Sequence, residues 1–353
     1  MSNSKQVRGE FSFFTADRLE EEFLESDNLL ANLSKMIPWE DFRKFLSGVY
    51  SDEGASHYDE LMLFKCLILA DCYGLNDAAL ERNIRDRLSF RFFLGMNLES
   101  RTPDRLTIMR FRERLSKKGL DGRLFGFFNE FLRSKGLIVS RGSMIDATFV
   151  DTPRMRNSRE ENQAIKEGKS YREVYPTKSQ SASFTSHKDL DARWVKKGEE
   201  RHFGYKNHVT ADVDSKLIKD FRVTPANVYD GNVHVEMLSG ESSDSHHVYA
   251  DSAYHGAAKQ IQELGFIPRI NEKGCRHRKL TQEQIEENRR KSKTRCRVEH
   301  VFADITNHGG TFIRAIGLAK AATKITLINL AYNLRRYVTI LTKGLSEHRI
   351  TLS

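Results

Sequence analysis

Residues 136–152 read GLIVSRGSMIDATFVDT, and this stretch divides the chain into two kinds of structure. Apolar and β-branched residues alternate with small or polar ones, which predicts a β-strand through Met144–Val150. The sequence before this strand has helical periodicity, whereas the sequence after it mixes strands and helices. Asp146 lies within the strand, where a carboxylate is costly to bury unless it is paired or binds a metal ion.

On the N-terminal side, residues 1–136 are predicted to form an all-α domain. Apolar side chains recur at three- and four-residue steps and predict a helix over 17–37. A strongly apolar helix over 58–74 ends at a glycine, and a further helix follows with Asn76 as its cap. The N-terminal part therefore reads as a series of short helices.

A helix over 101–115, RTPDRLTIMRFRERL, is expected to begin at the cap residue Thr102. As part of a helix-turn-helix-like unit it would contact DNA through Arg105, Arg110 and Arg112. A solvated basic face on an ordinary helix explains the same pattern. The helix by itself leaves both interpretations open.

After the boundary, residues 137–345 are expected to form an α/β domain with a mixed sheet flanked by helices. Residues 153–200 are polar, basic and poor in aliphatic side chains, which is typical of a long loop or a partly disordered insertion. A hairpin around Asp214-Ser215 comes next. Strands and helices then alternate, and the last two helices are expected at 295–306 and 319–342.

The composition excludes several classes of protein. The chain has 353 residues, with 57 Lys and Arg against 48 Asp and Glu and a formal net charge of +9. No stretch approaches the roughly 18 consecutive apolar residues of a membrane span, and the first residues lack the apolar core of a secretory signal. The four cysteines form no C-x-x-C pair, so we expect reduced thiols in a cytoplasmic protein. The positive charge weakly favours an anionic partner.

Cysteine and histidine suggest one metal hypothesis. Cys275, His277, Cys296 and His300 could supply two thiolates and two imidazoles, but their spacing fits structural zinc sites poorly. The sequence motifs of serine hydrolases, Walker-type NTPases and classical dinucleotide-binding domains do not occur.

Three acids suit a different metal chemistry. Asp146 is in the first strand, Asp251 ends a later strand in VYADSAYHG, and Glu299 is inside a helix in RCRVEHVF. Ligands gather at strand ends in open α/β sheets, and hard cations such as Mg2+ bind carboxylate oxygens. Two such ions can activate an attacking oxygen and stabilise the leaving oxygen of a phosphoryl transfer.

At these residues the sequence resembles the DDE transposases of bacterial insertion sequences, in particular the insertion-sequence-five group. The resemblance covers roughly residues 20–340, and the N-terminal block from about Trp39 to Leu115 resembles that group's helical domain. It rests on short motifs in the family's order: IDAT (145–148), FGYKNH (203–208), TPANVYD (224–230), ADSAY (250–254), RCRVEHVF (295–302) and NLAYNLRR (329–336).

The resemblance implies an RNase H-like catalytic domain in which Asp146, Asp251 and Glu299 bind two Mg2+ ions, with Mn2+ able to substitute. It implies cleavage at the ends of an insertion sequence and strand transfer into target DNA. The implied partner is double-stranded DNA, both the terminal inverted repeats and the target. Joining two ends implies at least a homodimer, and the implied location is the bacterial cytoplasm.

The wider family has a tyrosine, arginine, glutamate and lysine signature around the glutamate. Arg295 matches the arginine, one helical turn before Glu299 on the same face. Ser292 stands where the tyrosine is expected and Thr306 where the lysine is expected. Specific contacts to the terminal bases therefore do not follow from the resemblance.

Positive charge is concentrated next to Glu299. Residues 269–297 carry eleven Lys and Arg against four Glu and lead directly into the helix of Glu299. Such cations set DNA affinity and its salt dependence, although a solvated loop is the plain alternative. Lys206 is a further candidate, and so is His208, for which a core or scaffold role is equally open. The candidate DNA contacts in the basic segment are Arg289, Arg290, Lys291, Lys293, Arg295 and Arg297.

Three other functions remain to be compared with transposition. A nuclease with the same fold would cut DNA without joining it. A domesticated DNA-binding protein would not need the three acids, and a helical interaction protein leaves them unexplained.

Overall fold

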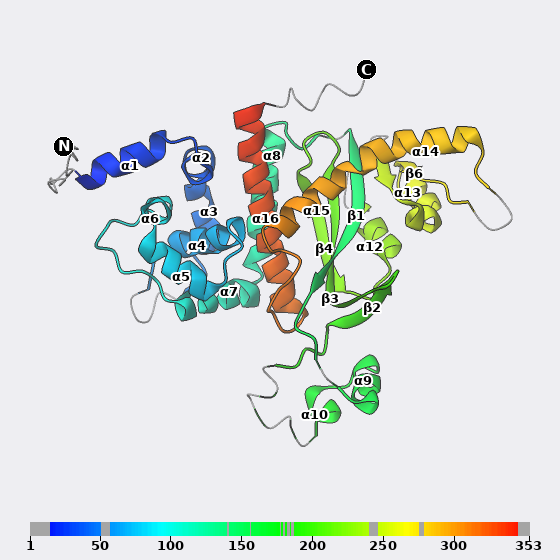
Figure 1. Cartoon of the computed structure of the whole chain (residues 1–353), viewed down its shortest axis with the longest axis horizontal. Helices are drawn as coiled ribbons and strands as arrows, with labels where there is room; N and C mark the ends of the chain where they lie inside the picture. Colours follow the sequence, from blue (N-terminus) through cyan, green and yellow to red (C-terminus); the bar gives the residue numbers. More distant parts are fainter. Residues whose placement is uncertain are drawn as a thin grey trace, which may run out of the picture.

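Helices precede the sheet, as the sequence predicts. The computed structural model describes residues 15–344 except 51–56, 140, 156, 177, 179, 180, 182, 183, 185, 186, 240–245 and 275–278. The helix predicted over 17–37 is two helices, because Asn28 accepts a hydrogen bond from Ala31 N and so caps a new helix. The helices before the first strand are α1 (Thr15–Glu25), α2 (Leu29–Met36), α3 (Trp39–Leu46), α4 (Glu60–Cys72), α5 (Asp77–Asp86), α6 (Leu88–Leu94), α7 (Arg105–Lys118) and α8 (Leu120–Ser134) (Figure 1).

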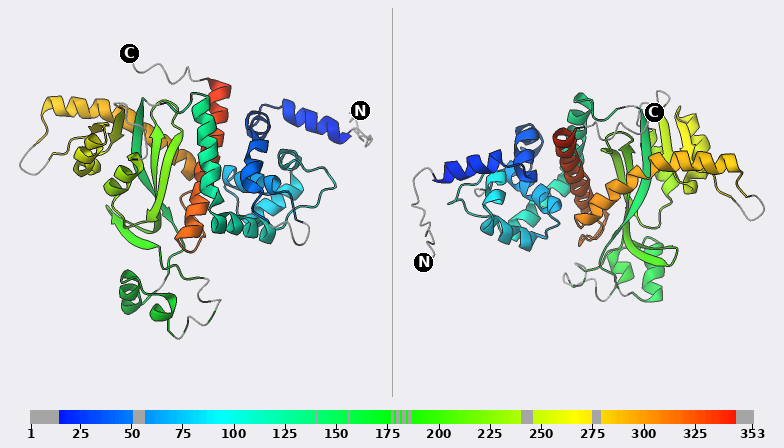
Figure 2. Two further views of the ribbon diagram at one scale, coloured as in Figure 1. Left: turned by 180° about the vertical axis from the view of Figure 1, so that it is seen from behind. Right: turned by 45° about the horizontal axis from the view of Figure 1, so that its top comes forward.

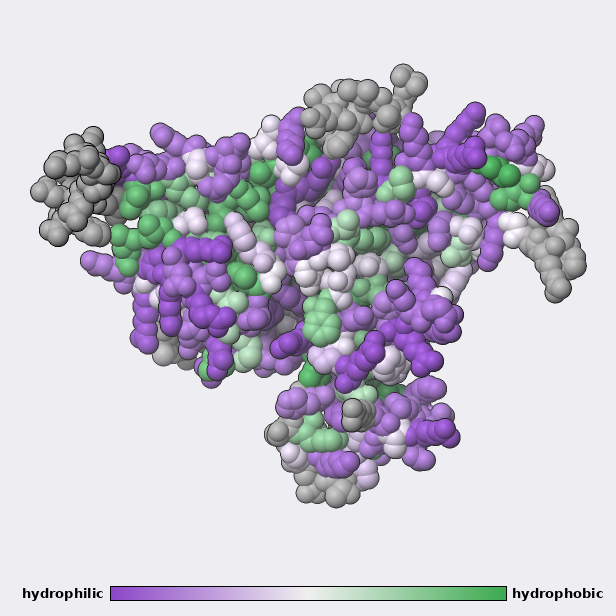
Figure 3. Space-filling model, in the orientation of Figure 1, coloured by the Kyte–Doolittle hydropathy of each residue, from purple (hydrophilic) through white to green (hydrophobic). Residues whose placement is uncertain are grey.

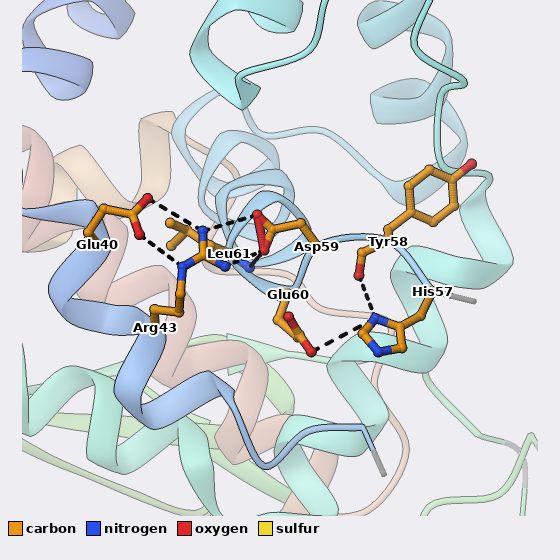
Figure 4. A network of polar contacts seen from close by, with 7 residues as sticks. All are labelled: Glu40, Arg43, His57, Tyr58, Asp59, Glu60 and Leu61. Carbon is orange, nitrogen blue, oxygen red and sulfur yellow. Dashed lines mark hydrogen bonds and ion pairs between the residues drawn. The ribbon is translucent and has the colours of Figure 1, made fainter. Parts of the chain in front are cut away.

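The helix α4 is apolar on every side and lies inside this helical layer. Ten of its 13 residues are buried, as expected for a helix without a polar face. Arg43 of α3 donates to Asp59 Oδ1 at 2.6 Å and to Glu40 Oε2 at 2.8 Å (Figure 4). Asp59 also accepts a hydrogen bond from Leu61 N as the N-cap of α4. One carboxylate thus begins α4 and fastens it to α3.

The described part of the chain forms one six-stranded mixed sheet. Its strands are β1 (Gly142–Asp151), β2 (Arg193–Lys197), β3 (Glu200–Asp212), β4 (Ile218–Pro225), β5 (His247–Ala250) and β6 (Ile267–Ile270). The order β4-β3-β1 is antiparallel, whereas β1, β5 and β6 are parallel, and β2 pairs with the first part of β3. This is the RNase H-like arrangement expected from the sequence. The predicted first strand and the hairpin around Asp214-Ser215 are confirmed.

Helices cover both faces of the sheet, and the alternation of side chains along β1 assigns each residue to a face. Ile145 packs in a core with residues of α12 (Asp230–Leu238) and α13 (Ala258–Glu263). Met144 belongs to the core that includes α15 (Arg297–Asn307) and α16 (Leu318–Lys343). Asp146 has the same parity as Met144, so it lies on the α15 side of the sheet.

The segment 153–200 is partly folded, which corrects the expectation of a long loop. The helices α9 (Arg159–Lys166) and α10 (Tyr171–Val174) each begin with a capping box, in which a serine and a glutamate exchange hydrogen bonds with the backbone. A small buried cluster of Ile165, Val174 and Tyr175 holds these helices together. Local capping and three apolar side chains therefore order a sequence that is polar overall.

The long helix α16 lies between the helical layer and the sheet, as Figure 1 and Figure 2 show. Asn329 exchanges two amide hydrogen bonds with Asn207 of β3, at 2.8 and 3.1 Å. Asn333 donates to Asn129 Oδ1 of α8 and to Ile218 O of β4, and it accepts from Ile218 N at 2.8 Å. These four asparagines are buried. Of the helices that the structure describes, none is long and apolar enough to cross a membrane.

We expect Asn333→Ala to lower the free energy of unfolding by about 2–4 kcal/mol, because Ile218 N–H and Asn129 Oδ1 would be left buried without these partners. Urea unfolding followed by circular dichroism measures the change. Asn307→Ala, at an exposed position of α15, is the control and should shift stability by no more than about 0.5 kcal/mol. Equal unfolding midpoints for the two variants would contradict this role of the asparagine contacts.

Candidate active site

Parallel strand pairing brings Asp146 and Asp251 together. The last parallel pair is Met144 of β1 with Tyr249 of β5, so the same register continued by two residues leads to Asp146 and to Asp251, just past the end of β5. Partners in register on neighbouring strands share one face of a sheet. Asp251 comes directly after β5, and its carboxylate accepts a hydrogen bond from Ala253 N at 2.8 Å. This bond begins the turn η1 (Ser252–Ala257) and fixes the side chain of Asp251.

The surroundings of Asp146 disfavour the charged form of its carboxyl group. Burial raises its pKa to about 6, and the negative charge of Asp251 acts in the same direction. A hydrogen bond from Ala147 N at 2.8 Å and the nearby Arg295 oppose this rise without cancelling it. Two neighbouring acids, both partly buried, form a site at which added positive charge is stabilising.

The third predicted acid, Glu299, is connected to this pair through Arg295. Arg295 Nη2 lies 3.0 Å from Glu299 Oε1, and Arg295 Nη1 lies 3.6 Å from Asp146 Oδ2. Glu299 is in the first turn of α15 and its side chain is 60% exposed, whereas Arg295 is only 19% exposed. One guanidinium therefore bridges two of the three acids on the α15 side of β1.

The helix of Glu299 begins differently from the prediction. The sequence predicts one helix over 295–306, whereas the structure has α14 (Gln282–Arg295) followed by α15, with Cys296 between them. Much of the basic segment 269–297 is thus helical, and not the solvated loop that was its alternative interpretation. Val298, Val301 and Ile305 form the buried side of α15 and leave Glu299 on its exposed side.

The donor set fits a hard divalent cation in part. Asp146 and Asp251 offer carboxylate oxygens at one place, which suits Mg2+ or a similar ion. Within the residues that the structure describes, no group of three His, Cys, Asp or Glu side chains is close enough to hold one ion. Glu299 therefore stands beside the pair, held by Arg295. For the zinc hypothesis, Cys275 and His277 lie outside the described residues.

Two protein-family models match the chain. A model described as "Transposase domain (DUF772)" matches residues 18–114, and one described as "Transposase DDE domain" matches residues 139–334, more than half of the chain. The chain belongs to the transposase DDE domain family. It is a DDE-type DNA transposase, and divalent metal ions are general cofactors of that family. A solved synaptic complex of the piggyBac transposase with hairpin DNA is similar at 12% identity and a TM-score of 0.40, over 92% of this chain and 76% of that chain.

Lys206 and His208 lie on the face of the sheet opposite Asp146, since they pair with Phe149 and Ala147. In the transposase both side chains have protein partners. Lys206 Nζ donates to Asp230 Oδ1 at 2.7 Å, and His208 Nε2 lies 2.8 Å from Thr224 Oγ1. The His208 side chain is fully buried, and burial lowers its pKa to about 3. Their predicted contact with DNA stays a prediction.

The other candidate DNA contacts divide into exposed and paired side chains. Arg289, Arg290 and Lys293 are exposed on α14, whose side of the molecule is hydrophilic in Figure 3. Lys291 donates to Ile270 O at 3.1 Å, and Arg297 donates to Val213 O at 3.1 Å.

On α7, Arg105 and Arg110 are exposed, whereas Arg112 forms a two-pronged ion pair with Asp77 of α5. Asp104 caps α7 in place of the predicted Thr102, because its carboxylate accepts a hydrogen bond from Thr107 N at 2.7 Å. Arg112 therefore holds the helical layer together, and the exposed arginines are those free to meet a partner surface.

Sequence reasoning assigned no role to two residues near the acids. Lys197 at the end of β2 is a positive charge that acts on Asp146. Tyr229, just before α12, donates from its hydroxyl to Ala253 O in the turn of Asp251. Tyr229 stands in the TPANVYD motif, but only the fold shows that this motif reaches the second acid.

The burial of His208 predicts a pH dependence of stability. Its folded pKa of about 3 lies below the ordinary value of 6.5, so below about pH 6.5 the unfolded chain binds a proton that the folded chain does not. Stability is then lost as the pH falls towards 3, by up to about 1.4 kcal/mol per pH unit from this group.

We expect His208→Gln to reduce this slope, measured by urea unfolding at several pH values between about 4 and 7.5. His255→Gln, at an exposed position, is the control and should leave the slope unchanged. A slope in His208→Gln equal to that of the unmodified protein would show that folding does not lower the pKa of His208.

Proposed function

We propose that this transposase cleaves DNA at the ends of an insertion sequence and joins those ends to target DNA by two-metal phosphoryl transfer. Asp146, Asp251 and Glu299 are the proposed metal ligands. The observation that carries the proposal is the parallel register of β1 and β5, which leads to Asp146 and Asp251 at the ends of the paired stretch. The charge of Asp251 acts on Asp146, and Arg295 links Asp146 to Glu299.

Mg2+ ions, for which Mn2+ can substitute, would when bound activate the attacking oxygen and stabilise the leaving oxygen. The chain's own residues supply position and charge. The backbone N–H groups of Ala147 and Ala253 orient the carboxylates of Asp146 and Asp251. Arg295 holds Glu299 towards the same place and limits the repulsion among the acids.

The proposed reaction has two steps, and each step forms one P–O bond as it breaks another. Water first attacks the phosphodiester at the element end, which breaks one P–O bond, forms another and releases a 3′-hydroxyl. That hydroxyl then attacks a target phosphodiester, so one bond forms to the element as one target bond breaks. Positioning and charge stabilisation dominate such a transfer. Besides the three carboxylates, the protein therefore needs no nucleophilic side chain.

We expect Asp146→Asn, Asp251→Asn and Glu299→Gln each to lower the cleavage rate at least about 100-fold, because each removes a carboxylate that stabilises transition-state charge through the metal. End binding should remain. Cleavage of labelled end DNA in Mg2+ and a gel-shift assay without metal measure the two properties. Glu263→Gln, an exposed acid on α13, is the control. Normal cleavage by any of the three variants would overturn the assignment.

A joining assay separates transposition from the nuclease alternative. A plasmid target and a precleaved end with a free 3′-hydroxyl should give joined product with the unmodified protein. Cleavage without joined product would favour an RNase H-fold nuclease. End binding without either reaction would favour a domesticated DNA-binding protein.

We also propose two DNA-binding regions. Residues 1–136, with Arg105 and Arg110 exposed, would bind the element ends. The catalytic domain, residues 137–345, would contact phosphates through the exposed cations of α14 and so place the duplex next to Glu299.

Replacing Arg289, Arg290 and Lys293 together by Ala should weaken DNA binding and make it less sensitive to salt. If all three contact phosphates, the slope of log K against log salt becomes shallower by up to about 2.7, since each phosphate contact contributes about 0.9. Fluorescence anisotropy at several salt concentrations measures this slope. Lys259→Ala, an exposed cation of α13, is the control and should leave it unchanged. An unchanged slope in the triple variant would exclude α14 from the DNA surface.

Within its family, we propose that this transposase belongs to the insertion-sequence-five group. The order of six motifs along the chain supports this proposal. Short inverted repeats immediately outside both ends of the gene would support it, and DNA lacking them on both sides would count against it. Because two element ends must be joined, we propose at least a homodimer in the working complex, which the mass of the protein–DNA complex tests.

A further inference from the structure

Tyr229 is an exposed aromatic side chain that contacts the turn carrying Asp251. Its exposed fraction is 54%, the highest among the large hydrophobic side chains in the described parts of the chain. An exposed ring has no packing reason to be fixed. In this protein it is fixed, from three directions.

The hydroxyl of Tyr229 ties the ring to the turn that carries Asp251. Tyr229 donates to Ala253 O at 2.7 Å, and Ala253 N–H donates to Asp251 Oδ1 at 2.8 Å. Ala253 therefore connects the aromatic ring and the acid through two hydrogen bonds.

The backbone on both sides of Tyr229 is held by Lys206. Its ammonium group donates to Val228 O at 2.8 Å and to Asp230 Oδ1 at 2.7 Å, which are the residues before and after Tyr229. The ring itself lies close to Gly231, where an added Cβ would come within 2.7 Å of Tyr229 Cε1. A glycine at 231 therefore permits the observed position of the ring.

We propose that Tyr229 is a stacking platform for a nucleobase next to the scissile phosphate, and that its hydroxyl keeps this platform in register with Asp251. The inference rests on the proposed function, since it takes DNA as the substrate of the acids. An aromatic ring that is rigid, exposed and next to a phosphoryl-transfer site can stack on any base, because every base has an aromatic face. Lys206 then acts as a positioning residue behind the platform.

The test uses the full-length protein and end DNA with 2-aminopurine at successive positions around the cleavage site. Stacking on Tyr229 should quench the fluorescence of one position. The measurement is made in EDTA, so it needs no catalysis. Tyr229→Phe keeps the ring but loses the hydrogen bond to Ala253 O, so it should weaken the quench, whereas Tyr229→Leu should abolish it. Gly231→Ala should reduce it by displacing the ring. Tyr73→Leu, an exposed tyrosine at the end of α4, is the matched control.

In Mg2+, we expect Tyr229→Leu to lower the rate of end cleavage by about 5- to 150-fold, the range that the loss of one base–aromatic stack corresponds to. An abasic site at the quenched position should lower the rate of the unmodified protein but have little further effect on Tyr229→Leu. A full quench in Tyr229→Leu would contradict the proposal that Tyr229 stacks on a base. Additive effects of the variant and the abasic site would contradict it as well. Absence of cleavage by the unmodified protein would instead refute the proposed function, while the quench in EDTA would still report on Tyr229.

Discussion

The buried amide contacts of α16 are the interaction on which the remaining structure depends. Asn329 meets Asn207 on β3, and Asn333 meets Asn129 on α8 together with the backbone of Ile218 on β4. An amide in a core must find its partners, so these contacts fix how α16 is rotated and how far it is displaced along its axis. An ion pair from Lys324 of α16 to Asp71 of α4 adds a second attachment to the helical layer. One helix thereby sets the position of the helical layer against the sheet.

The position of α16 in turn sets the position of the third acid. The helix α15 packs against both α16 and β1, with Val298 and Val301 buried between them. Glu299 is consequently exposed at the edge of this packing, while Arg295 at the end of α14 reaches both Glu299 and Asp146. The two aspartates depend on strand register, whereas Glu299 depends on helix packing. The candidate site is therefore assembled by two kinds of contact.

Charge in this transposase serves two purposes that its net value of +9 does not separate. Some cations are used inside the fold, such as Arg112 with Asp77 and Lys206 with Asp230. Others, such as Arg289 and Lys293 on α14, are exposed. A buried cation neutralises a fixed acid and stabilises one arrangement of the chain, whereas an exposed cation can release its counterions to a DNA phosphate. Only the second kind can contribute to the salt dependence of binding.

The sequence alone predicted most of the order of helices and strands, because periodicity and turn residues are local properties. Its short motifs implied the RNase H-like class and named Asp146, Asp251 and Glu299 as the candidate acids. It could not determine that Lys206 and His208 are buried, that α14 ends at Cys296, or that two capping boxes order the segment 153–200. Nor could it determine that Tyr229 is tied to the turn of Asp251. These features depend on contacts between residues far apart in the chain, and their energies exist only once the strands and helices have packed. Tertiary structure thus decided which polar residues are part of the scaffold and which remain free to act.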